Sequence, residues 1–141
     1  MPEAFRRSVT IAATPEAVWS TLTDWSIVSS WMERVDWVDT TSDPPLQVGS
    51  TLEFHARGKK RPAEITRLQE PHELTITSVE GPVRTDYTYT LRSTDDGTEL
   101  ELVAQCAARG FIRLFAPLLR RAMAKTDGDQ PEALKELVEA G

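Results

Sequence analysis

Two tyrosines are the clearest case in this chain of polar groups on the apolar face of a predicted strand. Tyr87 and Tyr89 alternate with polar residues across residues 83–92, so both belong to the apolar face of a predicted strand. A phenol hydroxyl on such a face can hydrogen-bond a ligand carbonyl or hydroxyl, or it can be satisfied within a packed core. Trp31 and Trp37 have the same two interpretations, ligand contact or structural packing.

The other reactive side chains form no recognisable catalytic or metal-binding pattern. His55 and His72 are the two histidines and lie far apart in the chain, whereas a metal site needs several convergent ligands. His55 is out of phase with its apolar neighbours, so we expect it to face solvent. Cys106 is expected to be a small buried side chain. Because we find no phosphate-binding glycine loop, nucleophile elbow or zinc spacing, we predict no metal, no cofactor and no assignable catalytic residue.

The composition sets the class of protein. A chain of 141 residues with 40% hydrophobic and 27% charged residues suits a single soluble globular domain, residues 1–141. The net charge of −6 argues against a nucleic-acid partner. A single cysteine excludes an internal disulfide and suits a reducing compartment. The N-terminus lacks an apolar signal core and no apolar run is long enough to span a bilayer, so we expect a cytoplasmic protein without integral membrane association.

The elements that must position the tyrosines begin with a strand and two short helices. Residues 5–12 alternate as a half-buried strand. Thr14 and Pro15 then mark a helix start, as capping hydroxyl and first helical position. Asp24 is placed to cap a second short helix over residues 25–31.

The middle of the chain, residues 33–107, predicts about six strands joined by short turns. Asp95-Asp96-Gly97 is a strong hairpin signal between the last two of them. The final strand places Leu100, Leu102, Ala104 and Cys106 on one face. Hairpins in series imply an antiparallel sheet with one face in water. A basic turn near the start of this region, Arg57 to Arg61, is either solvated or binds an anionic group.

The last third of the chain predicts a long amphipathic helix that the sheet must cover. Its apolar positions recur at helical spacing: Phe111, Phe115, Leu118, Leu119, Ala122, Leu134, Leu137 and Val138. The run Asp127-Gly128-Asp129-Gln130-Pro131 interrupts it, because proline cannot donate a backbone hydrogen bond. We expect a kink or break there, with Asp129 as the N-cap of the resumed helix.

The chain resembles the SRPBCC superfamily (START-like, Bet v 1-like), and within it the polyketide cyclase/dehydrase-like bacterial branch. The resemblance covers virtually the whole chain, and its motifs are weak singly but specific in their common order. They are Ile11-Ala12-Ala13-Thr14-Pro15-Glu16-Ala17-Val18-Trp19, Leu22, Asp24, Trp31, Val48-Gly49, Gln69-Glu70-Pro71-His72-Glu73-Leu74, Tyr87-Thr88-Tyr89-Thr90-Leu91, Gly97-Thr98, Gly110, Pro117 and Leu134-Lys135-Glu136-Leu137. Met32, where the family often has proline, and the Asp127–Pro131 interruption depart from the pattern.

The resemblance implies an α+β helix-grip fold. In that fold a curved antiparallel sheet of about seven strands wraps a long C-terminal helix, and two short helices follow strand one. It also implies a cavity between sheet and helix for a small hydrophobic or amphipathic molecule. The residues expected to line that cavity are Trp31, Trp37, Phe54, Tyr87, Tyr89, Leu102, Ala104, Phe115 and Leu119.

Three functions fit this resemblance. The first is binding or transport of a hydrophobic ligand such as a lipid, quinone or polyketide-like aromatic. The second is an enzyme of the polyketide cyclase, aromatase or dehydratase type, with Tyr87, Tyr89 or an arginine polarising a carbonyl. The third is a protein-interaction module with a filled core. We expect a monomer or homodimer. The scaffold alone does not choose among these functions.

Overall fold

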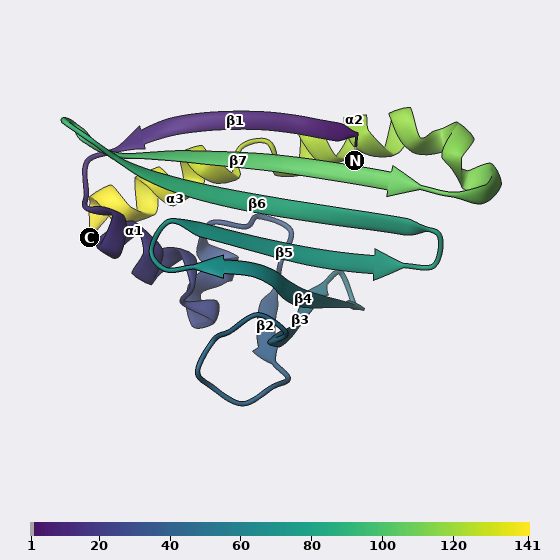
Figure 1. The fold of residues 1–141 in the computed structure, drawn as a ribbon, viewed down its shortest axis with the longest axis horizontal. Helices are drawn as coiled ribbons and strands as arrows, with labels where there is room; N and C mark the ends of the chain where they lie inside the picture. Colours follow the sequence, from purple (N-terminus) through teal and green to yellow (C-terminus); the bar gives the residue numbers. More distant parts are fainter. Residues whose placement is uncertain (1) are drawn as a thin grey trace.

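The computed structural model describes residues 2–141 and contains a seven-stranded antiparallel sheet (Figure 1). The strand order is β1-β7-β6-β5-β4-β3-β2. The strands are β1 Glu3–Ile11, β2 Trp37–Thr40, β3 Thr51–Ala56, β4 Lys59–Gln69, β5 Glu73–Glu80, β6 Val83–Thr94 and β7 Gly97–Ala108. Consecutive strands from β2 to β7 pair as neighbours and β1 closes onto β7, so the expected α+β helix-grip architecture is confirmed.

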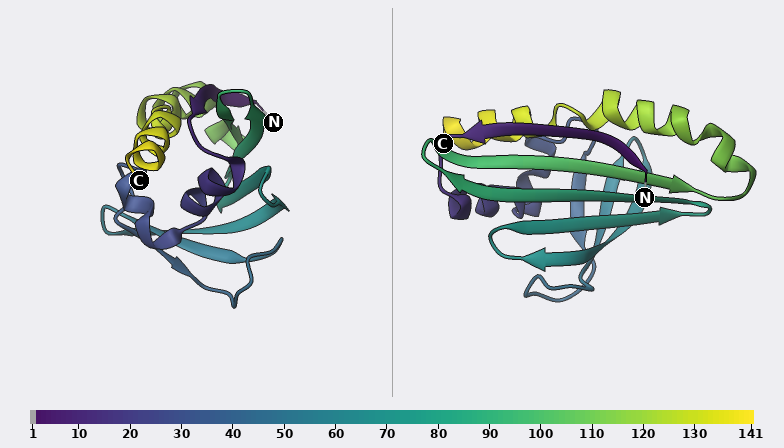
Figure 2. Two further views of the ribbon diagram at one scale, coloured as in Figure 1. Left: turned by 90° about the vertical axis from the view of Figure 1, so that its left-hand side faces the viewer. Right: turned by 45° about the horizontal axis from the view of Figure 1, so that its top comes forward.

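Two short helices follow β1 where the capping residues predicted them. Helix α1 spans Pro15–Leu22, and Thr14 Oγ1 accepts a hydrogen bond from the backbone N–H of Ala17 at 3.2 Å. The 3₁₀ helix η1 spans Trp25–Ser30 and is capped by Asp24. Figure 2 shows α1 lying across the open end of the curved sheet. Val18 and Val28 are fully buried there, so both helices seal that end of the core.

The C-terminal segment is three consecutive helices and not one. They are η2 Gly110–Phe115, α2 Ala116–Asp127 and α3 Gln130–Ala140, which run along the β1–β7 side of the sheet (Figure 2). The predicted break is present between Asp127 and Gln130. Asp129 occupies the N-cap position of α3, but its side chain makes no capping hydrogen bond.

The β6–β7 hairpin holds the longest strand pair and supplies much of the core. Tyr87 lies opposite Ala104 and Tyr89 opposite Leu102, so large side chains face smaller ones across the pair. Gly97 starts β7 with φ of 135°, and a Cβ there would lie 2.1 Å from the Ile11 carbonyl oxygen. Glycine is therefore required at this turn, because both the backbone conformation and the space exclude a side chain.

The sheet does not cover the whole apolar stripe of the C-terminal segment, which corrects the sequence-based expectation. Phe111, Phe115 and Leu118 are 75%, 51% and 61% exposed. Helix α2 instead turns the face of Ala116 and Met123 toward the core, where Ala116 is buried and Met123 is half-buried. The inward face of α2 is thus made of small and flexible side chains. Within residues 2–141, no helix is long and apolar enough to cross a bilayer.

Candidate functional site

Tyr87 and Tyr89 both point from β6 toward the C-terminal helices. Tyr89 is 1% exposed, and Tyr87 is half-buried against the same core. The Tyr87 ring packs edge-on against Phe5 at a centroid distance of 6.2 Å. The alternation read from the sequence therefore places both hydroxyls on the interior face of the sheet, as predicted.

The partners of these hydroxyls come from the break between α2 and α3. The Tyr87 hydroxyl donates to Asp127 Oδ2 at 2.5 Å, and the Tyr89 hydroxyl donates to Gln130 Oε1 at 2.7 Å. The Gln130 side chain is also hydrogen-bonded to Asp127. Asp127 ends α2 and Gln130 begins α3, so the helix-breaking run holds both polar side chains over the tyrosines. We call these four residues the interior polar cluster.

The electrostatics of the interior polar cluster disfavour charge. Burial raises the pKa of both tyrosines far above the usual value near 10, and the Asp127 carboxylate raises them further. Burial also raises the pKa of Asp127, against the hydrogen bonds from Tyr87 and Gln130 and the charge of Arg34. The cluster therefore suits neutral hydrogen-bonding groups, such as a carbonyl or hydroxyl, better than an anion.

Trp31 adds a hydrogen-bond donor without an acceptor. Its side chain is 2% exposed, and its ring meets that of Tyr89 edge-on with centroids 6.2 Å apart. Within the described part of the chain, Trp31 Nε1 is the buried side-chain nitrogen or oxygen atom that lacks a partner. Leaving such a donor unpaired costs about 1–3 kcal/mol. An acceptor supplied from outside the chain would recover that energy.

The structure brings together most of the predicted lining residues, but not all. Leu102 and Ala104 are fully buried on β7, and Phe54 and Leu119 are half-buried. Phe115 is 51% exposed on η2. Trp37 lies outside the core, 53% exposed on β2, with its ring stacked on that of His55. Asp127 and Gln130 were not predicted as site residues, although their helix-breaking run was recognised.

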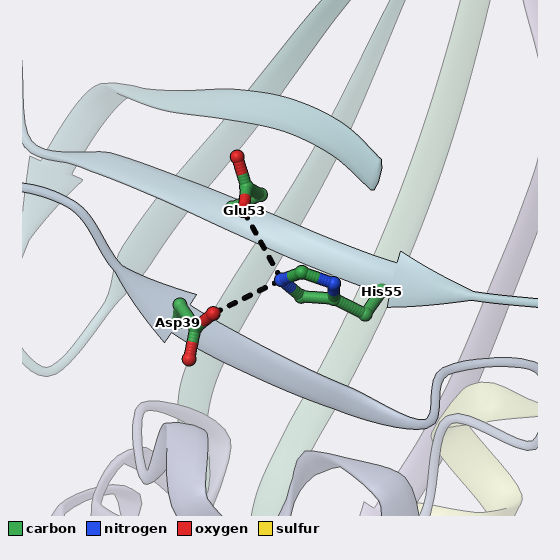
Figure 3. Close-up of side chains that lie close together, drawn as sticks. All are labelled: Asp39, Glu53 and His55. Atoms are coloured by element: carbon green, nitrogen blue, oxygen red, sulfur yellow. Dashed lines mark hydrogen bonds and ion pairs between the residues drawn. The ribbon is translucent and has the colours of Figure 1, made fainter. Parts of the chain in front are cut away.

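A second polar cluster lies on the β2–β3 strands, shown in Figure 3. His55 Nε2 is 3.0 Å from Asp39 Oδ2 and 3.1 Å from Glu53 Oε1. Strand pairing sets Asp39 opposite Glu53 and Trp37 opposite His55, and the Trp37 ring stacks on the imidazole at 4.2 Å. His55 is consequently only 8% exposed, which corrects the expectation that it faces solvent. The cause is the covering indole ring.

The β2–β3 cluster has donor atoms of the kind that bind a divalent cation. One nitrogen and two carboxylate oxygens lie within 4.8 Å of one another. The His55 Nε2–H can donate to Asp39 Oδ2, and Glu53 Oε1 lies close to the same nitrogen. The cluster therefore forms hydrogen-bonding contacts within itself on the sheet surface, and it is separate from the interior polar cluster.

Two surface hollows lie away from the interior polar cluster. One, of about 400 Å³, is lined by Lys59, Lys60, Arg61, Pro62, Val79 and Glu80. It includes the basic turn noted in the sequence. The other, of about 240 Å³, lies between η1 and the β2–β3 region and includes Trp25 and Leu46.

The chain was compared with protein families and with curated protein sequences. A family model described as polyketide cyclase / dehydrase and lipid transport matches residues 2–139. No curated protein sequence matches the chain significantly.

Several solved structures have the same fold. The protein TTHA0849 from Thermus thermophilus shares 22% identity, with 99% of this chain and 98% of that chain covered and a TM-score of 0.75. The Mesorhizobium loti protein MLL2253 shares 21%, with 96% of each chain covered and a TM-score of 0.72. The Zhui aromatase/cyclase from a Streptomyces species shares 16%, with 96% and 92% covered and a TM-score of 0.73. At these identities the likeness shows the fold alone.

Proposed function

Because the chain belongs to the polyketide cyclase/dehydrase and lipid transport family, we propose that it binds one small hydrophobic or amphipathic molecule between the sheet and the C-terminal helices. The polar end of that molecule accepts a hydrogen bond from Trp31 Nε1, beside Tyr89. Its apolar part lies toward the half-buried side chains of Tyr87, Leu119 and Met123.

The observation that carries this proposal is the unpartnered donor of Trp31. Buried polar groups in folded proteins are almost always hydrogen-bonded, so an orphaned indole N–H indicates a missing acceptor. The neighbouring tyrosine hydroxyls are already engaged by Asp127 and Gln130. Among the described residues, Trp31 Nε1 is therefore the interior donor that a ligand acceptor can engage.

The ligand is expected to be apolar over most of its surface. The side chains on the interior face of β6 and β7 are mostly aromatic or aliphatic, and the polar groups beside them are the interior polar cluster, Thr85, Cys106 and Arg120. Burial of apolar area contributes roughly 25 cal/mol per Å² before the costs of association. A single hydrogen bond to Trp31 then sets the orientation and not the bulk of the affinity.

A second candidate function is catalysis on a polyketide-like substrate. The observation that favours it is the Tyr87–Asp127 pair, in which a carboxyl group of raised pKa holds a phenol at 2.5 Å. In its protonated form Asp127 is the member of this pair that can donate a proton toward a substrate carbonyl, and Tyr87 holds it in position. Conversion of a poly-β-keto substrate that is lost in Tyr87→Phe would favour this function over simple binding.

The binding proposal is tested by native mass spectrometry with panels of fatty acids, isoprenoid quinones and aromatic polyketides. We expect a saturable one-to-one adduct with at least one class, and about tenfold weaker binding in Trp31→Phe. Trp37→Phe is the matched control, because that indole is exposed and outside the core. Thermal unfolding of both variants checks that they fold. No saturable adduct, or equal affinity in Trp31→Phe, would overturn the proposal.

A further inference from the structure

The start of the C-terminal segment exposes a row of large apolar side chains. Phe111 and Leu114 are 75% and 76% exposed, and Phe115 and Leu118 are 51% and 61% exposed. Their spacings of three and four residues place them on one side of η2 and the first turn of α2. We call these four residues the η2–α2 apolar face. The other exposed large apolar residues of the described chain are Trp37 on β2, Val79 on β5 and Val48 in the loop between β2 and β3.

Positive charge lies along the same segment as the η2–α2 apolar face. Arg109, Arg113, Arg121 and Lys125 are all exposed along the same segment. None of these four forms an ion pair with another residue of the described chain. No aspartate or glutamate occurs between Glu101 and Asp127, although the whole chain has a net charge of −6. The segment is therefore a cationic and apolar region on an acidic protein.

This combination matches the surface of an anionic lipid bilayer. Helices that lie in the membrane interface place apolar side chains at the boundary between headgroups and acyl chains, with Lys and Arg alongside the lipid phosphates. A second copy of the chain is a poor occupant, because a symmetric contact would bring the four unpaired cations of each copy together. Charge complementarity thus selects a negatively charged partner with an apolar layer beneath its charge.

We propose that η2 and the first turn of α2 bind the surface of anionic membranes, with the η2–α2 apolar face inserted among the lipids. The contact is peripheral, since the four apolar residues cover less than three turns of helix and no described helix can span a bilayer. It does not depend on the ligand proposed for the interior. The two proposals can therefore fail separately.

Vesicle flotation with the full chain tests this proposal. We expect the protein to float with vesicles of phosphatidylglycerol and phosphatidylcholine, to float far less with phosphatidylcholine alone, and to be released by high salt. The double variant Phe111→Ser/Leu114→Ser should lower partitioning at least about tenfold, because it removes two of the four inserted side chains. Arg113→Gln/Arg121→Gln should lower partitioning to anionic vesicles by about tenfold or more.

The matched control is Val48→Ser/Val79→Ser, which removes two exposed apolar side chains elsewhere on the surface. This control should float like the unaltered protein, and circular dichroism should show all variants folded. The proposal is overturned if the protein fails to float with anionic vesicles. It is equally overturned if Phe111→Ser/Leu114→Ser floats as well as the control Val48→Ser/Val79→Ser. It is also overturned if Phe111→Ser/Leu114→Ser dissociates a dimer detected by native mass spectrometry, because the face would then be covered by a second copy.

Discussion

Helix α3 and the η2–α2 segment have similar apolar spacing but opposite environments. Leu134 of α3 is fully buried, and Leu137 and Val138 pack partly against the core. Leu118, at the start of α2, is 61% exposed, in line with its neighbours on η2. Apolar periodicity therefore indicates that a helix has a face to bury, but it does not say which surface covers that face.

The difference follows from how each helix is attached to the rest of the fold. Helix α3 is held at its start by Gln130 bonded to Tyr89, and further along by Lys135 Nζ, which donates to the Thr10 carbonyl at 2.6 Å. Glu139 Oε2 accepts from the Ala12 N–H at 2.9 Å. These hydrogen bonds hold the apolar face of α3 against β1 and α1. At the start of α2, Ala116 is buried and Leu119 is half-buried, whereas Leu118 is exposed.

The largest expected effect is a difference in the free energy of unfolding between a substitution in α3 and one in α2. Leu134→Ala should lower the free energy of unfolding by about 2–5 kcal/mol, because it leaves a cavity in a fully packed site. Leu118→Ala should change it by no more than about 0.5 kcal/mol, because that side chain is already exposed. Urea unfolding followed by circular dichroism measures both. Equal losses would show that the start of α2 is buried in solution.

A smaller effect is expected at the contact that begins α3. Tyr89→Phe should cost about 1–3 kcal/mol of unfolding free energy, because Gln130 Oε1 remains buried without its donor. The double variant Tyr89→Phe/Gln130→Leu should recover part of that loss, since both polar groups are then gone. Urea unfolding of the single and double variants gives the coupling energy. Strict additivity would mean that this hydrogen bond does not attach α3 to the sheet.

The smallest effect concerns the last residue of α2 and depends on pH. Burial raises the pKa of Asp127, so the folded state favours the protonated carboxyl. Its stabilising contribution is fully present below the unfolded pKa, near 4, and is lost as pH rises through the folded pKa. Asp127→Asn should remove this pH dependence and raise the melting temperature at neutral pH, because the amide oxygen can still accept from Tyr87.

The matched control for this pH effect is Asp95→Asn, at an exposed position in the turn between β6 and β7. It should leave the melting temperature close to that of the unaltered protein across the same pH range. If Asp127→Asn lowered the melting temperature at neutral pH, the interior polar cluster would require the negative charge of Asp127.

The sequence was sufficient for the family, the fold class and the interior orientation of both tyrosines. Alternation along β6 and β7 predicted which side chains face inward, and Thr14 and Asp24 predicted the short helices. The resemblance to the polyketide cyclase/dehydrase-like branch is confirmed by the family match over residues 2–139. These features are local in sequence or repeat with a regular period, so they can be read without three-dimensional information.

The site itself needed the structure, because its members are distant in the chain. Asp127 and Gln130 lie 40 and 41 residues from the tyrosines that they contact. The run Asp127-Gly128-Asp129-Gln130-Pro131 predicted a helix break but gave no sign of what the break places over the sheet. The burial of His55 could likewise not be predicted from the sequence, because it depends on the Trp37 ring of the paired strand.

The sequence by itself thus determined the elements, their order and the apolar stripe of the C-terminal helices. Only the tertiary structure decided which part of that stripe is core and which part is surface. The physical reason is that the rotation of a helix about its axis depends on all the surfaces that it contacts. In η2 Phe111 and Phe115 face outward, and in α2 Leu118 does so, while in α3 Leu134 faces inward.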